Sequence, residues 1–109
     1  MPYDEGLAQR IRDALEDRSD VSEKKMFGGL AFLLGGNMCV GVIGEDLMVR
    51  VGADAYAETV RQPHARKMDF TGRPMKGFVY VGCDGIESDE NLRRWVARGV
   101  DFAGSLPSK

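Results

Sequence analysis

The stretch KKMFGGLAFLL, residues 24–34, carries the features that decide the fold. Two lysines lead into an apolar run with the composition of a β-strand, and Gly28 and Gly29 interrupt its start. Glycine weakens an isolated strand, so the pair indicates a local bend or the close approach of another backbone. No Lys-Ser or Lys-Thr pair follows in a strand-to-helix loop, as a phosphate-binding P-loop would require. The stretch therefore predicts a packing feature and does not define a reaction.

Length and composition indicate one globular domain. A chain of 109 residues is long enough to bury a core of its own, and 43% hydrophobic with 29% charged residues is ordinary for such a domain. The net charge of -2 gives no overall attraction to nucleic acid or to an anionic membrane. No run approaches the roughly 20 apolar residues of a membrane-spanning helix, and the acidic start does not resemble a signal peptide. We expect a cytoplasmic protein.

Hydrophobic spacing and turn residues predict the order of the elements. A helix is expected from Asp4 to about Asp17, because apolar residues recur there at helical spacing. Glycine-rich turns then separate three strands, which short turns force to be antiparallel neighbours. These strands are expected at Met26–Leu34, Met38–Ile43 and Leu47–Val51. The later elements are a helix over Ala53–Arg61, a short strand over Lys67–Phe70, a strand over Phe78–Val81 and a helix from Ser88 or Asp89 to Ala103.

This order of helices and hairpins predicts an α+β fold with helices against one antiparallel sheet. The first strand is apolar on both faces, because Leu30, Phe32 and Leu34 alternate with Ala31 and Leu33. A sheet with one face in water would alternate apolar with polar residues. We therefore expect the second face to be covered, either by the chain's own helices or by another subunit.

Several motifs in a fixed order resemble the N-terminal domain of the TfoX/Sxy family. The resemblance covers the chain from about Tyr3 to Ala103. The motifs are KKMFGG at 24–29, DLMVR at 46–50, TGRPM at 71–75, FVYV at 78–81 and DENLRRW at 89–95.

The resemblance implies a fold and a biological setting. It implies a secretion-chaperone-like α+β domain with four to five antiparallel strands and three helices, in the order α-β-β-β-α-β-(β)-α. The family is named for bacterial positive regulators of natural competence, which act in transcription with a cyclic-AMP receptor protein. Full regulators carry a second, C-terminal helical domain, and we expect this chain to be a stand-alone N-terminal domain.

Basic residues are the main candidates for partner binding. Between Arg61 and Lys76 there are five bases against Asp69 alone. If the loop after Pro63 lies beside the start of the first strand, one cationic patch would form and attract an anionic partner. Its members would be Lys24, Lys25, Arg66, Lys67, Arg73 and Lys76. Direct nucleic-acid binding is the alternative, with Phe27, Phe70, Phe78 and Tyr80 as stacking platforms, although aromatic residues on strands more often fill the core.

Other reactive residues have plainer interpretations. His64 could act as an acid or base, but no nucleophile or carboxylate forms a recognisable motif with it, so we expect a surface histidine. Four acids lack the spacing of a calcium loop and are expected to begin the last helix: Asp84, Glu87, Asp89 and Glu90. Cys39 and Cys83 have no ligand spacing, and we expect both to be reduced core residues. A disulfide between them is the alternative, and it would require their strands to be adjacent.

Together these features predict a non-enzymatic protein-interaction or regulatory module. We assign no catalytic, cofactor-binding or metal-binding residue. The expected partner is another protein or a second copy of the chain, and a homodimer is one form of this hypothesis. A small ligand-binding domain or enzyme is the remaining alternative. The sequence does not favour it, because a paired acid and base or a nucleophile is not evident.

Overall fold

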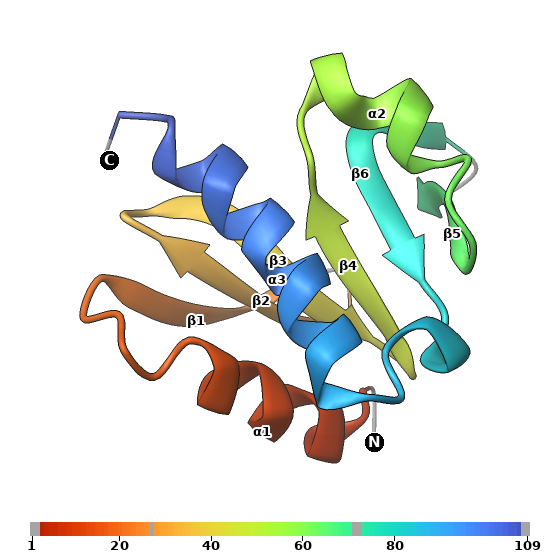
Figure 1. Ribbon diagram of the computed structural model, residues 1–109. Helices are drawn as coiled ribbons and strands as arrows, with labels where there is room; N and C mark the ends of the chain where they lie inside the picture. Colours follow the sequence, from red (N-terminus) through yellow and green to blue (C-terminus); the bar gives the residue numbers. More distant parts are fainter. Residues whose placement is uncertain (1–2, 27, 71–72, 108–109) are drawn as a thin grey trace.

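Six antiparallel strands form one sheet, in the order β1-β2-β3-β4-β6-β5, and three helices pack against it (Figure 1). The structure is a computed structural model that describes residues 3–26, 28–70 and 73–107, with the backbone alone at 69–70 and 73–76. The α+β class and the three helices agree with the sequence prediction. The sheet has more strands than the four to five expected.

The helices and strands have the following bounds. The helices are α1 (Glu5–Ala14), α2 (Ala53–Thr59) and α3 (Asp89–Gly104), with a short 3-10 helix, η1 (Cys83–Gly85). The strands are β1 (Val21–Met26), β2 (Gly29–Leu34), β3 (Asn37–Ile43), β4 (Asp46–Arg50), β5 (Ala65–Phe70) and β6 (Arg73–Val81).

Two of the helices begin at the capping residues that the sequence indicates. The Asp4 carboxylate accepts hydrogen bonds from the backbone N–H groups of Gly6 at 2.9 Å and Leu7 at 3.2 Å. The Ser88 hydroxyl accepts one from the N–H of Asn91 at 3.1 Å. Each contact satisfies backbone donors that the first turn of a helix leaves unpaired.

The predicted first strand, Met26–Leu34, is wrong in its extent. Gly28 has a φ of 74°, a left-handed conformation that glycine adopts readily, and it belongs to a turn. The chain reverses there, and β1 pairs with β2 in a hairpin in which Lys24 lies opposite Ala31 and Met26 opposite Gly29. Because β1 is mostly exposed, it lacks the apolar alternation that would have identified it.

The rest of the sheet follows the predicted hairpins. Gly35 and Gly36 turn the chain between β2 and β3 with φ values of 59° and 83°, and Gly44 turns it between β3 and β4 with 59°. Strand β6 then pairs with both β4 and β5, so it lies inside the sheet while β5 forms an edge. The predicted strands Lys67–Phe70 and Phe78–Val81 are the C-terminal parts of β5 and β6, which both begin earlier than predicted.

One face of the sheet forms the hydrophobic core with the helices. Helix α3 packs on β2, β3 and β4, α1 packs on α3 and β3, and α2 packs on β6. In Figure 1, α1 and α3 lie in front of the sheet. The core joins Leu7 and Ile11 of α1 and Trp95 of α3 to alternate residues of the strands. These strand residues are Leu30, Phe32, Leu34, Cys39, Val40, Val42, Leu47, Val49, Val79 and Val81, and Val51 joins them just after the end of β4.

Helix α3 lies unusually close to β3. A Cβ atom at Gly99 would come within 2.7 Å of the Cys39 carbonyl oxygen and of Val40 Cγ1, closer than real side chains pack. Gly99 therefore allows the helix to rest directly on the strand, as glycine does at close backbone approaches.

The two cysteines occupy different environments, and both are free thiols. Cys39 is buried in β3, and burial raises the pKa of its thiol to about 12, because an apolar surrounding disfavours the thiolate. Cys83 is exposed in η1, so the prediction that it is a core residue is wrong.

Candidate interaction surface

The sheet has a second face, which we call the open face. Its residues alternate with those of the core, because successive side chains point to opposite sides of a sheet. The exception is in β3, where the pairing with β2 shifts register and Cys39 and Val40 both belong to the core. The core on the first face contains residues of α1 and α3, and Tyr56 and Val60 of α2 pack against it. Among the described residues, the three helices thus lie on the core face. No helix of the described part of the chain lies over the open face.

One row of residues crosses the open face from edge to edge. Cross-strand pairs join Lys24 of β1 to Ala31, Ala31 to Gly41, and Gly41 to Met48. Met48 is paired with Tyr80, and Tyr80 with Arg66 of β5. The row therefore has small and apolar residues in its middle and a cation at each end.

The centre of this row is packed. Ala31 and Met48 are each only 1% exposed. A Cβ atom at Gly41 would lie 2.8 Å from the Leu30 carbonyl oxygen and 2.9 Å from Met48 Cε. The Met48 side chain therefore occupies the space above Gly41 that another residue would fill.

Apolar side chains beside the centre are half-buried. Leu33 of β2 and Met38 of β3 are cross-strand partners, and both are partly exposed. Ile43, near the other end of β3, is also partly exposed. An antiparallel sheet facing only water would carry polar residues at these positions. The open face thus combines a packed centre with apolar side chains that remain accessible to a partner.

The two ends of the row differ in their contacts. Arg66 forms an ion pair with Asp46, and its guanidinium lies over the Tyr80 ring at 5.0 Å. These contacts hold Arg66 against the open face, with half of its side chain still exposed. Lys24 is exposed on edge strand β1.

The predicted cationic residues do not form one patch. Lys24 and Lys25 lie on β1 and Arg66 and Lys67 on β5, and these strands are the two edges of the sheet. Five strand spacings of about 4.8 Å separate them, or roughly 24 Å. Within each pair the alternation places one side chain on either face. Arg73 and Lys76 lie in β6, but their side chains are outside the described part of the structure.

The predicted aromatic platform is also divided. Phe27 and the side chain of Phe70 lie outside the described residues. Phe78 and Tyr80 of β6 are half-buried, and each contacts an arginine, Arg50 at 5.6 Å from the Phe78 ring and Arg66 at 5.0 Å from the Tyr80 ring. Arg50 also lies 5.2 Å from the ring of Phe102, so it connects the sheet to α3.

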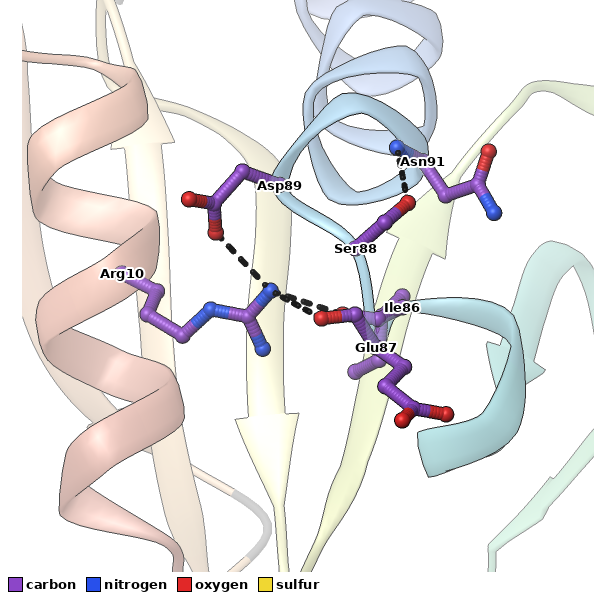
Figure 2. Close-up of polar contacts among 6 residues, drawn as sticks. All are labelled: Arg10, Ile86, Glu87, Ser88, Asp89 and Asn91. Atoms are coloured by element: carbon purple, nitrogen blue, oxygen red, sulfur yellow. Dashed lines mark hydrogen bonds and ion pairs between the residues drawn. The ribbon is translucent and has the colours of Figure 1, made fainter.

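Of the four acids expected to begin the last helix, Asp89 and Glu90 lie in the first turn of α3, whereas Asp84 lies in η1 and Glu87 in the segment before the helix. Figure 2 shows Arg10 of α1 reaching the segment that leads into α3. Its guanidinium donates to the carbonyl oxygens of Ile86 at 2.8 Å and Glu87 at 3.2 Å, and to the Asp89 carboxylate at 3.1 Å. Glu90 pairs with Arg94 within α3 at 2.7 Å. In the described part of the chain, no group of three or more His, Cys, Asp or Glu residues is placed to hold a metal ion.

His64 is exposed in the turn between α2 and β5 and has a φ of 69°. It lines a hollow between this turn and α3, together with Arg94, Trp95 and Arg98. The sequence predicted a second apolar face that includes Leu33, but it did not indicate the arginines of this hollow. The two-sided apolar pattern of β2 and β3 was the signal for Leu33 and Met38. The hydrogen bond between Arg98 and Gln62 joins residues 36 positions apart, so no local sequence pattern could have predicted it.

The described structure defines a two-layer α+β domain with one helix-covered and one open sheet face. Residues 13–103 match the TfoX N-terminal domain, and the chain belongs to that family. No curated protein matched the sequence. Among the described residues, no helix has the length and apolar character needed to cross a membrane.

Proposed function

We propose that the chain is a non-enzymatic protein-interaction module, and that its open sheet face binds a segment of a different protein. The observation that supports this proposal is the set of partly exposed apolar side chains, Leu33, Met38 and Ile43, on a face over which no described helix lies. Burying such side chains against a partner removes apolar surface from water, which favours association.

The charges of the open face favour a partner with carboxylates beside an apolar centre. The row ends in Lys24 on one edge and Arg66 on the other. In a symmetric pair stacked face to face, a twofold axis along the strands would bring Lys24 over the Arg66 of the second copy. An axis along the row would bring Lys24 over its own equivalent. Both arrangements place Lys24 over another cation, whereas an acidic rim on a different protein would complement Lys24; Arg66 already has an ion-pair partner in Asp46.

Membership of the TfoX N-terminal domain family supports a regulatory setting. We propose that the partner is a component of transcription regulation, as the resemblance to competence regulators implies, and that the interaction takes place in the cytoplasm. In this proposal the domain recruits or positions its partner and carries out no reaction.

The test uses a photo-crosslinking residue in place of Leu33 on the open face, or in place of Leu106 on the helix side. Both leucines are half-buried, which makes the second position a matched control. Cross-linking in the native cell, with and without nuclease, identifies proteins captured from each position. A protein captured from position 33 is then purified and titrated with the unmodified domain and with its Leu33→Ser and Leu106→Ser variants.

We expect Leu33→Ser to weaken binding at least about tenfold, as for an apolar residue in the centre of an interface, and Leu106→Ser to leave it unchanged. Binding should also weaken moderately with salt if carboxylates face Lys24 and Arg66. Equal effects of the two variants would contradict the proposed surface. Capture that disappears with nuclease would support the nucleic-acid alternative. Sedimentation of the domain as a dimer that Leu33→Ser dissociates would support self-association. Either result would refute the proposed partner.

A further inference from the structure

A hollow of about 290 Å³ lies between the turn after α2 and the outer side of α3. Its size is near the lower end of the roughly 300 to 1,000 Å³ typical of small-molecule sites. Polar groups that line it come from segments far apart in the sequence. They are Gln62, His64, Asn91, Arg94 and Arg98, and Trp95 lies beside them.

The backbone fixes His64 at the border of this hollow. His64 is the one described non-glycine residue with a left-handed φ, at 69°, a conformation that costs free energy in most residues. Its carbonyl oxygen accepts a hydrogen bond from the N–H of Gly82 at 3.1 Å. A Cβ atom at Gly85 would lie only 2.6 Å from His64 Cβ, so the absence of a side chain there makes room for the imidazole.

Arg98 presents a cation to the hollow without a carboxylate partner among the described side chains. Its guanidinium donates to the Gln62 side-chain oxygen at 3.1 Å and lies over the Trp95 ring at 4.8 Å. Both contacts orient the guanidinium, and neither neutralises its positive charge, because an amide and an aromatic ring are uncharged. Arg94 is paired with Glu90, but both side chains are more than two-thirds exposed, and an exposed pair of this kind is weak enough to exchange partners.

A second hollow on α3 provides an internal comparison. It lies toward α1 and is also lined by two arginines, Arg10 and Arg93, but Asp13 and Asp89 line it as well. Its cations are therefore balanced by carboxylates. Of the described residues, no carboxylate lines the hollow beside His64, and the described lining has a net positive charge.

We propose that the hollow beside His64 binds the oxyanion group, a carboxylate or a phosphate, of a small molecule. A guanidinium offers two parallel N–H donors that match the oxygens of such groups, and Arg94 and Arg98 supply two of these forks. The imidazole of His64 and the amide of Asn91 add further donors. This site lies in the helix layer, so it is independent of the open sheet face.

The test is a titration of the isotope-labelled domain with inorganic phosphate or with succinate, followed by NMR. Sodium chloride at matched ionic strength serves as the blank. We expect saturable shifts at the Trp95 indole N–H and the Gly85 amide with one or both anions, and the stronger anion identifies the favoured group. Arg98→Gln should weaken binding about tenfold or more, the cost of removing a charge-assisted hydrogen bond.

Arg93→Gln is the matched control, because Arg93 is an exposed arginine of the same helix that faces the other hollow. It should leave the titration unchanged. Arg94→Gln, at a side chain that is 71% exposed, provides a second weakening variant that does not depend on the fold tolerating a change at Arg98. Shifts that match those of the chloride blank, or that fall equally in the Arg93 and Arg94 variants, would overturn the proposal.

Discussion

The two faces of the sheet are made by the same strands and differ in almost every contact. On the covered face, Leu30, Phe32 and Leu34 of β2 are 5%, 1% and 4% exposed and pack with the helices. On the open face, Leu33 of the same strand is half-buried and pairs with Met38. Neighbouring residues of one strand thus lie in different environments, one in the core and the next on an accessible surface. The covered face holds the domain together, and in our proposal the open face holds a partner.

Replacing Phe32 by alanine should produce the largest loss of stability. Phe32 is 1% exposed in the core, and removing a buried phenyl ring leaves a cavity, at a cost of about 3 to 5 kcal/mol. Urea unfolding, followed by the fluorescence of the one tryptophan, Trp95, measures this loss. Leu33→Ala, one residue away on the open face, should cost less than about 1.5 kcal/mol. Equal losses would remove the distinction between the faces.

Gly41→Ala tests whether the open face has a packed centre of its own. The new methyl group would meet the Leu30 carbonyl oxygen at 2.8 Å, and a backbone atom cannot move aside easily. We expect a loss of about 1 to 3 kcal/mol. The control is Gly104→Ala in α3, where the nearest atom, Leu34 Cδ2, is 3.8 Å away. A neutral Gly41→Ala would show that the backbone at Leu30 can move aside and that the centre of the open face is not tightly packed.

The covered face was largely predictable from the sequence, because its elements have strong local signals. Helical spacing identified the first and last helices, and the apolar composition of residues 30–34 identified β2 as a buried strand without showing which of its faces the helices cover. Strand β1 was missed as a separate strand because an exposed polar edge strand has no such alternation.

The site was less predictable, because it depends on strand order. Placing Lys24 and Arg66 on opposite edges requires β6 to lie between β4 and β5, which no local pattern reveals. The apolar residues of the open face did have a signal, the two-sided composition of β2. That pattern predicted that both faces of the sheet would be buried, but it did not predict which face the helices would pack against.

Arg10→Gln tests how the helix layer over the covered face is held together. The variant loses the contacts of the Arg10 guanidinium with Ile86, Glu87 and Asp89, which tie α1 to the start of α3 (Figure 2). Since the Arg10 side chain is 34% exposed, we expect a loss of about 1 to 2 kcal/mol in urea unfolding.

Arg94→Gln is the comparison for this variant. It breaks an exposed pair within α3 and should cost less than about 0.5 kcal/mol. An Arg10 variant no less stable than the Arg94 variant would show that the contacts of Arg10 do not support the helix layer.

The smallest expected effect concerns the link between α1 and edge strand β1. The Arg12 guanidinium holds the pKa of the Glu23 carboxyl below its ordinary value, mainly through the hydrogen bonds between them at 2.7 and 2.9 Å. The folded chain therefore binds a proton at Glu23 less readily than the unfolded chain. The pair stabilises the fold above the unfolded pKa of about 4.3, and this contribution is lost as the pH falls through the lower folded pKa.

Because the Glu23 side chain is 36% exposed, we expect a contribution below about 0.5 kcal/mol. The unfolding free energies of the wild type and of Glu23→Gln, measured at pH 7 and pH 3, check this. The difference between them should shrink at pH 3. A difference that is the same at both pH values would contradict the assigned link.

Hydroxyl-radical footprinting of the methionines tests the central claim most directly. Met38 and Met48 both lie on the open face. The Met38 side chain is half-buried, whereas Met48, in the packed centre of the face, is only 1% exposed. In the free domain we predict oxidation of Met38 and protection of Met48. When the partner captured from position 33 is added, Met38 should become protected. Protection of Met38 in the free domain, or its unchanged oxidation in the complex, would contradict the proposal that this face is open and binds the partner.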